Sequence, residues 1–297
     1  MVIFGDPAHP HVFERPIRRV AIVGAGPSGL AAARHLRDKG IHVRIFERNA
    51  RPGGVWLYSS KTGAQPDDIG QPGPVYSSLM NNIALPLCQL KDFPWPAGTR
   101  WNEHHHVLQK YLGDYASHFG LTEAGGVLSL NTRVDLLERT ATGWVAHVTD
   151  SRSSHNESFD AVVVAAGHHS VPHLPASCPD PPDPQLIRHS KDYRTPDEFD
   201  DEVVMLVGAG TSGLDIHRDL HGHARKIYHS AREVSSTNED FLRLRTTQMN
   251  AIEAVGPTSC RVGEIHAIQV ADGVIEVVRL KDGSELRDIQ RIIFCTG

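Results

Sequence analysis

The clearest pattern in the chain is a short apolar run that leads into a cluster of glycines. Val20 to Val23 is apolar and flanked by charged residues, which is typical of a buried parallel strand. An alanine-rich stretch with helical character follows to about Lys39, and Gly40 is suited to end a helix. Ile41 to Phe46 predicts the next strand. This order of strand, glycine turn, helix and strand predicts a β-α-β unit.

The same pattern returns in the second half of the chain. Val203 to Leu220 repeats Val20 to Leu36 at a distance of 184 residues. Lys226 to His229 then predicts a second strand, as in the first copy. Similarity at this distance indicates a duplicated unit and not a short-period solenoid.

The stretch between the copies predicts a helix and further strands. Glu103 to Phe119 has apolar residues near helical spacing. Alternation from Val127 to Val148 predicts a small antiparallel sheet, and Phe159 to Gly167 predicts another buried strand. The proline-dense stretch Leu174 to Gln185 can be neither helix nor central strand, so it predicts a linker. Beyond the second copy, strands are predicted over Arg261 to Val270, Val274 to Leu280 and Ile289 to Phe294.

Gly24, Gly26 and Gly29 form a G-x-G-x-x-G turn, and Glu47 stands 23 positions after the first glycine. Such a turn suits a dinucleotide. The first glycine turns tightly, the second lets the backbone approach a pyrophosphate, and the third lets helix and strand pack closely. Glu47 can accept hydrogen bonds from a ribose 2′-OH and disfavours a 2′-phosphate. A single motif of this kind leaves an alternative open, namely a glycine-rich turn that binds no ligand.

The start of the first helix adds an anion site. Pro27 and Ser28 fit a helix start, with Ser28 as the expected N-cap. A helix N-terminus offers unpaired N–H groups and the positive end of a dipole to phosphates.

The second copy carries a different charge after its second strand. Arg232 occupies the region where the first copy has Glu47. Arginine matches a phosphate with a planar fork of donors, so this copy is suited to the 2′-phosphate of NADP. A solvated surface arginine is the alternative. The candidate residues of the second turn are Gly208, Gly210, Thr211, Ser212 and Gly213.

An acid at one site and an arginine at the other predict FAD in the first unit and NADPH in the second. These cofactors carry redox chemistry themselves, and the protein positions them. We therefore predict an α/β fold with two Rossmann-like, three-layer ββα domains. Residues 1–175 form the first part of an FAD-binding domain, 176–258 an inserted NADPH-binding domain, and 259–297 a return to the FAD-binding domain.

The net charge and the hydropathy of the chain limit the classes of partner that are expected. A net charge of −5 at pH 7 provides no basic field, so neither nucleic acid nor an anionic membrane is expected. An apolar run of 18 residues, as a membrane span requires, is absent from the sequence. The first 17 residues also lack the apolar core of a secretion signal.

The cysteines and histidines limit the kinds of reaction and metal site that are expected. The four cysteines are scattered without a C-x-x-C pair, which favours reduced thiols in the cytoplasm and argues against a disulfide reductase. The 19 histidines invite a metal hypothesis, but His104 to His106 would point to different faces of a helix, so no metal site is expected. Hydrolytic triads and carboxylate pairs are also missing. By elimination, electrons pass to oxygen or to a diffusible acceptor.

Taken together, the motifs resemble those of the flavin-containing monooxygenases, in particular the soluble fungal and plant-like branch. The likeness covers nearly all of the chain from Arg18 and is carried by the order and spacing of its pieces. These are GAGPSG at 24–29, Glu47, GGVW at 53–56, Tyr76 to Pro96, AAGHHSVPHLP at 165–175, HSKDYR at 189–194, GAGTSG at 208–213 and CTG at 295–297. Family members usually continue well past the C-T-G turn, so we expect this chain to lack the C-terminal segment that completes the flavin domain.

One family signature, F-x-G-x-x-x-H-x-x-x-Y, is matched only in its last part. His189 and Tyr193 fit the signature, and the tyrosine favours this group over the Baeyer–Villiger enzymes. Asp183 and Gln185 stand where phenylalanine and glycine are expected.

The resemblance implies an activity like that of N,N-dimethylaniline monooxygenase. NADPH reduces FAD, O2 forms a C4a-hydroperoxyflavin, and the amine nitrogen or sulfur of a small molecule takes the distal oxygen. Asn82 matches the family asparagine beside the flavin, and Trp56 is expected to line the flavin pocket; an ordinary turn asparagine and a core tryptophan are the alternatives. Gly54 and Gly167 complete the cofactor residues.

Other functions stay open at this point. One is a truncated, non-catalytic relative that binds nucleotide, and another is an NADPH oxidase or reductase without oxygenation. The location expected from the thiols is the cytoplasm, and a homodimer is compatible with the sequence.

Overall fold

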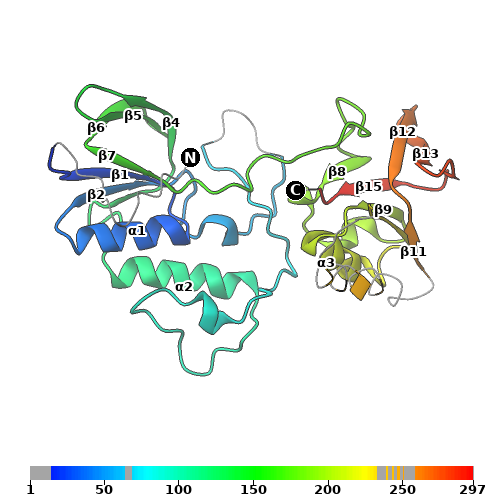
Figure 1. Cartoon of the computed structure of the whole chain (residues 1–297), viewed down its shortest axis with the longest axis horizontal. Helices are drawn as coiled ribbons and strands as arrows, with labels where there is room; N and C mark the ends of the chain where they lie inside the picture. The colour runs from blue at the N-terminus through cyan, green and yellow to red at the C-terminus, as the bar shows by residue number, and fades with distance from the viewer. Residues whose placement is uncertain are drawn as a thin grey trace. The chain divides into compact units, whose positions relative to one another are not determined.

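The computed structural model describes residues 15–63, 69–232 and 258–296, together with residues 239, 243, 246, 247 and 250. This part of the chain forms two compact units, most of whose helices and strands are labelled in Figure 1. Unit 1 contains the described residues of 15–57, 69–72 and 80–167. Unit 2 contains 58–63, 73–79 and the described residues from 168 onward.

Unit 1 is built on a parallel four-stranded sheet with the order β3-β2-β1-β7. Its strands are β1 (Arg19–Val23), β2 (His42–Phe46), β3 (Leu128–Ser129) and β7 (Ala161–Val164). The apolar run predicted as a buried strand is confirmed, because Ala21 and Ile22 in β1 are fully buried.

Two layers cover the faces of this sheet. α1 (Pro27–Arg37) and α2 (His105–His118) run side by side on one face, where Leu30, Leu112 and Tyr115 contribute to the core. The other face packs against the antiparallel sheet β4-β5-β6, through Phe46 and Phe159 among others. The strands of this sheet are β4 (Thr132–Arg139), β5 (Trp144–Asp150) and β6 (Ser154–Phe159). Two short 3-10 helices complete the unit, η1 (Gly54–Trp56) and η2 (Leu85–Cys88).

Unit 2 repeats this plan. Its parallel sheet has the order β11-β10-β9-β15-β8, with β9 (Val203–Val207), β10 (Lys226–Ser230), β11 (Ser259–Val262), β15 (Arg291–Phe294) and β8 (Ile187–His189). Helix α3 (Thr211–Leu220) packs on one face, and the antiparallel strands β12 (Ile265–Ala271), β13 (Val274–Leu280) and β14 (Glu285–Leu286) pack on the other. The 3-10 helices are η3 (Ser190–Asp192) and η4 (Pro196–Phe199). The prediction of two three-layer, Rossmann-like units is confirmed.

The structure differs from the predicted domain boundaries. Residues 259–297 were expected to return to the first domain, but β11 pairs with β10 and β15 pairs with β9, so both strands belong to the sheet of unit 2. Residues 291–296, RIIFCT, follow the same apolar pattern as residues 161–166, AVVVAA. The likeness has a structural reason, because β15 and β7 take the same place beside the first strand of each unit. The boundary between the units lies at Gly167 and not near residue 175.

Two short stretches from the first half of the sequence belong to unit 2, and Arg194 holds them there. The Arg194 side chain is buried, and burial lowers the pKa of its guanidinium from the ordinary value. The guanidinium donates hydrogen bonds to the carbonyl oxygens of Ser59 at 2.6 Å, Lys61 at 3.1 Å, Gly73 at 3.1 Å, Lys191 at 2.7 Å and Tyr193 at 2.8 Å. One side chain therefore satisfies backbone acceptors from three separate stretches of chain.

Candidate dinucleotide-binding sites

The first glycine turn connects β1 to α1. Gly24 has φ +102°, and a Cβ on it would lie 2.5 Å from the carbonyl oxygen of Ala165. A Cβ on Gly29 would lie 1.9 Å from the carbonyl oxygen of Gly24. Both positions therefore require glycine, the first because of its positive φ and both because backbone atoms lie too close for a side chain.

The N-terminus of α1 is open to a ligand. Gly26 is the N-cap, Pro27 occupies the first helical position, and among the described residues no side chain caps the helix. The prediction of Ser28 as the N-cap is therefore wrong, because Ser28 already lies within the first turn, where its own N–H needs a partner. The N–H groups of Ser28 and Gly29 are suited to a phosphate.

A second pair of glycines packs against this turn. Gly54 has φ +57°, and a Cβ on it would lie 2.8 Å from the Cα of Gly26. The N–H of Gly53 donates to the carbonyl oxygen of Ala25 at 3.0 Å. The GGVW motif thus covers one side of the first turn, and Gly26 is buried.

Glu47 is held against the same turn. Its side chain is only 4% exposed, at the carboxyl end of β2. One carboxylate oxygen accepts the N–H of Ala25 at 2.8 Å, and the other accepts the N–H of Asn49 at 2.9 Å. Each oxygen has a further lone pair, so the carboxylate can still accept a ribose hydroxyl. The structure therefore brings Glu47 to the first glycine turn, as the spacing predicts.

Gly167 and Trp56 complete the surroundings of the first turn. Gly167 is exposed with φ +73°, two residues after Ala165, whose carbonyl oxygen lies against Gly24. Trp56, at the end of η1, is half-buried and packs against the hydrophobic core of unit 1. Part of the Trp56 side chain thus belongs to the core, which was the alternative to a place in the flavin pocket.

Asn82 is presented by a turn that its neighbour organises. Asn82 is exposed, whereas Asn81 is buried. The Asn81 side chain accepts the N–H of Glu103 at 2.6 Å and donates to the carbonyl oxygen of Trp101 at 3.2 Å. Asn81 is a residue that sequence reasoning missed, since two adjacent asparagines do not indicate which one is buried.

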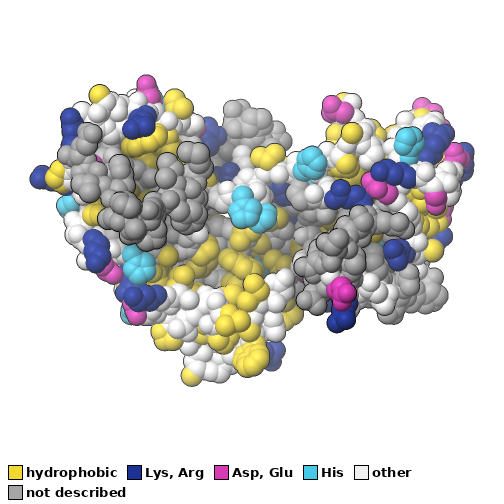
Figure 2. Space-filling view, in the orientation of Figure 1, with side chains coloured by type: hydrophobic (Ala, Val, Ile, Leu, Met, Phe, Trp, Pro, Cys, Tyr) yellow, Lys and Arg dark blue, Asp and Glu magenta, His cyan; other side chains and the backbone are white. Residues whose placement is uncertain are grey.

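The segment around Asn82 exposes large apolar side chains. Met80, Ile83, Leu87 and Trp101 are all exposed, Leu87 by 81%. Figure 2 shows apolar side chains gathered over the lower part of unit 1, where this segment runs in Figure 1. Asn82 therefore lies in a segment that exposes these apolar side chains alongside polar ones such as Ser78 and Asn102.

The second glycine turn connects β9 to α3 and has the same backbone geometry. Gly208 has φ +109°, and a Cβ on it would lie 2.5 Å from the carbonyl oxygen of Cys295. A Cβ on Gly213 would lie 2.0 Å from the carbonyl oxygen of Gly208. Gly210 is the N-cap of α3.

This second turn is more open than the first. Gly210, Thr211 and Ser212 are exposed. Apart from the neighbours of Gly210 in the chain, no described atom lies within 4 Å of a Cβ built on it. In unit 1 the same position, Gly26, faces Gly54.

Arg232 lies one position beyond the place of the acid. Phe46 pairs with Val23 in unit 1, and Ser230 pairs with Val207 in unit 2. Ala231 is therefore the counterpart of Glu47, and Arg232 is the counterpart of Arg48. Arg232 is exposed just after the carboxyl end of β10, which is the sheet edge where parallel α/β folds bind ligands.

The matched part of the family signature packs against α3. The hydroxyl of Tyr193 donates to Asp219 at 2.6 Å, and that of Tyr76 donates to Asp215 at 2.9 Å. Burial first, and then the neighbouring carboxylates, raise the pKa of both tyrosines above the ordinary value. His189 accepts the N–H of Lys191 at 3.1 Å and so begins η3. These contacts give the signature residues a structural role, and sequence reasoning missed the two aspartates.

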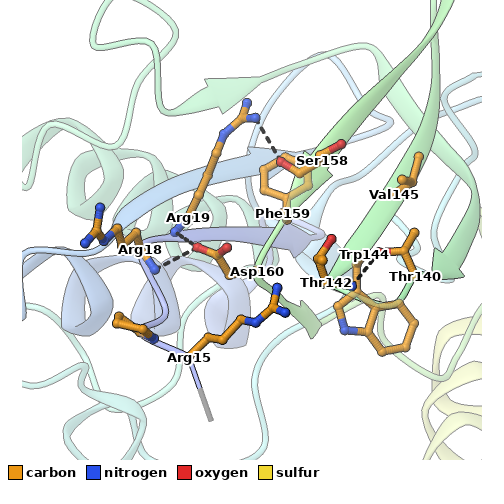
Figure 3. Close-up of a pocket in the computed structure, with 12 residues that line it drawn as sticks. Arg15, Arg18, Arg19, Thr140, Thr142, Trp144, Val145, Ser158, Phe159 and Asp160 are labelled. Carbon is orange, nitrogen blue, oxygen red and sulfur yellow. Dashed lines mark hydrogen bonds between the residues drawn. The ribbon is translucent and has the colours of Figure 1, made fainter. Parts of the chain in front are cut away.

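One further hollow lies in unit 1, away from the glycine turn of that unit. It has a volume of about 630 Å³ and is lined by Arg18, Trp144 and Asp160 among others, as Figure 3 shows. Asp160 there accepts the N–H groups of Arg18 and Arg19 at 2.8 Å each. This hollow lies at the amino end of β1, and none of the predicted cofactor residues lines it. Dinucleotides bind at the carboxyl ends of parallel strands, so this hollow is not their site.

Over the described ranges, there is no group of three or more His, Cys, Asp or Glu side chains arranged to hold a metal ion. The helices in the same part of the chain are too short or too polar to cross a bilayer.

Comparison with known proteins adds independent information. The family model described as flavin-binding monooxygenase-like matches residues 17–239. The flavin-containing monooxygenase iboF of Amanita muscaria is 32% identical, over 97% of this chain and 66% of its own length. Senecionine N-oxygenase of Tyria jacobaeae is 36% identical, over 73% of this chain and 48% of its own.

Among solved structures, S-allyl-L-cysteine S-oxygenase from Allium sativum has 27% identity and a TM-score of 0.74. The match covers 94% of this chain and 62% of that one. This chain spans about half to two thirds of the length of the curated relatives that it matches.

Proposed function

Because the chain belongs to the flavin-binding monooxygenase-like family, we propose that it acts as an FAD- and NADPH-dependent monooxygenase on a small molecule. The observation that carries the proposal is the pair of glycine turns. They share one backbone geometry, but a buried acid meets the first and an exposed arginine follows the strand beside the second.

The cofactors are FAD and NADPH, and the residues of the two turns fit them. In unit 1, the uncapped N-terminus of α1 suits a diphosphate, and Glu47 suits a ribose hydroxyl. In unit 2, the exposed N-terminus of α3 suits a diphosphate, and Arg232 suits a 2′-phosphate. The residues proposed to hold FAD are Gly24, Gly26, Pro27, Ser28, Gly29, Glu47, Gly54, Trp56, Asn82 and Gly167. Those proposed to hold NADPH are Gly208, Gly210, Thr211, Ser212, Gly213 and Arg232.

When bound, FAD supplies the activation of O2, and the protein has to orient the reactants and exclude water. We assign these tasks to Asn82 and Trp56. The exposed amide of Asn82 can donate to a developing oxygen anion, and apolar side chains of the same segment, such as Met80 and Ile83, can help to exclude water. The finer mechanism, oxygen transfer from a C4a-hydroperoxyflavin, is part of the same proposal.

The proposed substrate is a soft nucleophile, either an amine nitrogen or a sulfur atom. Support comes from relatives whose names include an N-oxygenase and an S-oxygenase. The proposed location is the cytoplasm, where scattered thiols such as Cys88 and Cys178 stay reduced. Nucleic acid and membrane are not among the proposed partners, and a homodimer is compatible with the proposal.

The visible spectrum of the purified chain during NADPH addition and reoxidation by O2 tests this proposal. We expect bound flavin, bleaching by NADPH, a transient oxygen adduct on reoxidation, and oxygenated product from a sulfide or tertiary amine. Bleaching that yields only hydrogen peroxide would contradict oxygenation and favour an NADPH oxidase. Failure to retain flavin, or to bleach it with NADPH, would favour the non-catalytic nucleotide-binding alternative.

A further inference from the structure

Two histidines are buried directly behind the second glycine turn. His217 on α3 is 1% exposed and His229 on β10 is 0% exposed. Their Nδ1 atoms are 3.0 Å apart. At the ends of this pair, Nε2 of His229 lies 3.0 Å from the carbonyl oxygen of Gly208, and Nε2 of His217 lies 2.9 Å from Oγ of Ser259.

With both rings neutral, these four groups allow one direction of hydrogen bonding. The carbonyl oxygen of Gly208 can only accept, so Nε2 of His229 carries the hydrogen and its Nδ1 accepts. His217 then donates through Nδ1, and its Nε2 accepts the hydroxyl of Ser259. Burial, followed by the nearby His229 and His221, lowers the pKa of His217 to about 4, so this ring is neutral at pH 7. The chain of donors therefore ends on the backbone of the turn.

Unit 1 is built without such a pair. Ile45 pairs with Ile22 in unit 1 as His229 pairs with Leu206 in unit 2, so Ile45 is the counterpart of His229. Ala33, 184 positions before His217, is the counterpart of His217. Ile45 and Ala33 are both fully buried. The α/β plan thus forms with an apolar pair, and unit 2 instead accepts the desolvation cost of two imidazoles.

A side chain contacts the same peptide in each unit, at its N–H in unit 1 and at its carbonyl oxygen in unit 2. In unit 1, the peptide between Gly24 and Ala25 is held through its N–H, which donates to Glu47 at 2.8 Å. In unit 2, Ala231 replaces the acid, and the peptide between Gly208 and Ala209 is held through its carbonyl oxygen by His229 at 3.0 Å. A peptide is planar, so fixing its carbonyl also fixes the direction of its N–H.

We propose that His217 and His229 are positioning residues that orient the peptide after Gly208 and so hold the second turn in the conformation that binds the diphosphate of NADPH. The pair acts from inside the unit, where His229 contacts the carbonyl oxygen of Gly208, and Ala231 takes the place of the acid. This inference rests on the proposed assignment of NADPH to the second turn.

The test measures the Kd of NADP+ for the flavin-loaded protein, together with KM and kcat for NADPH. The double variant His217→Ala/His229→Ile carries the residues of unit 1. We expect this variant to fold and to keep its flavin. The Kd of NADP+ and the KM of NADPH should rise about tenfold, which corresponds to the loss of one hydrogen bond. The kcat at saturating NADPH should stay within about twofold of wild type. His229→Gln, whose amide can still donate to Gly208, should stay within about threefold of wild type in Kd, and His229→Leu should not.

The matched control is Ile227→Ala, which removes a buried side chain from the same face of β10 without touching the turn. It should lower the melting temperature and leave the Kd unchanged. An unchanged Kd in the double variant would overturn the inference. So would equal losses of NADP+ affinity in His229→Gln and His229→Leu, or a loss of NADP+ affinity in Ile227→Ala as large as that in the double variant. If the double variant does not fold, the two single variants of His229 decide. Wild-type protein that does not bind NADP+ would instead contradict the proposed function.

Discussion

The two units share one backbone plan but support their glycine turns by different means. In unit 1 the support is outside the helix-sheet interface: Glu47 accepts the N–H of Ala25, and Gly54 packs against Gly26. In unit 2 the support lies inside that interface, where His229 donates to the carbonyl oxygen of Gly208. The fold therefore fixes the shape of the turn, while the neighbouring segments set how open it is.

This difference in openness matches the two proposed cofactors. The first turn is covered by the backbone of Gly54, and Gly26 is buried. The second turn leaves Gly210, Thr211 and Ser212 exposed. We interpret the covered turn as suited to a resident flavin and the open turn as suited to a nicotinamide dinucleotide that binds and leaves in each cycle.

The largest expected effect comes from adding one methyl group to either turn. Gly29→Ala and Gly213→Ala each bring a Cβ to about 2 Å from a carbonyl oxygen of the backbone, so the turn has to open. We expect Gly29→Ala to lose FAD and Gly213→Ala to keep FAD but to weaken NADP+ binding by at least about 100-fold, or about 3 kcal/mol. Flavin content and NADP+ titration measure both. If either variant lost the other cofactor instead, the assignment of the two turns would be reversed.

A second effect concerns pH and only unit 2. Well above pH 6.5, the ordinary pKa of histidine, His217 is neutral in the folded and unfolded chain. As the pH falls below 6.5, His217 becomes protonated in the unfolded chain. In the folded chain the pKa of His217 is about 4, so the ring stays neutral until the pH approaches that value. The folded state should lose roughly 3 kcal/mol of stability over this window.

Urea unfolding of wild type and His217→Ala at pH 7 and pH 4.5 measures this effect. Other groups titrate in both proteins, so the difference between the two isolates His217. We expect the wild type to lose more stability than the variant on acidification. Parallel losses would mean that His217 is not buried as a neutral ring.

Glu47→Gln tests the support of the first turn, the part of the comparison that concerns unit 1. An amide oxygen accepts a hydrogen bond more weakly than a carboxylate, and the amide nitrogen cannot accept one at all. One of the two backbone N–H groups at Ala25 and Asn49 is thereby left without an acceptor. We expect FAD to dissociate about tenfold more readily, with unchanged affinity for NADP+. A change in NADP+ affinity and none in FAD retention would contradict the account.

An effect of about the same size as that of Glu47→Gln is expected on cofactor choice. Arg232→Ala should weaken NADPH about tenfold and leave NADH nearly unchanged, because only NADPH has the 2′-phosphate. Arg218→Ala, an exposed arginine on α3, is the matched control and should affect neither. Equal losses of NADPH and NADH in Arg232→Ala would remove its proposed role.

Local patterns in the sequence were enough to predict the two β-α-β units. The apolar run of β1, the glycine spacing and helix α2 depend on residues close together in the chain. Pairing between distant strands does not: β15 joins β9 some 87 residues earlier, and no local pattern separates that place from a return to the first sheet.

Side-chain details of the sites were harder to predict for the same reason. Arg232 lies in the predicted region, yet the strand register gives the place of Glu47 to Ala231. The histidine pair depends on contacts among Gly208, His217, His229 and Ser259, which meet only when the helix and three strands are assembled. Ser28 was mistaken for a cap because a serine near a helix start is common at either position.

A crystal structure of the chain with FAD and NADP+ bound is the most direct test of the central claim, that one duplicated turn holds FAD and the other NADPH. The account predicts the FAD diphosphate at the N-terminus of α1 with its ribose on Glu47, and the NADP+ diphosphate at the N-terminus of α3 with its 2′-phosphate on Arg232. Both cofactors on one turn, the reverse order, or a 2′-phosphate away from Arg232 would contradict it.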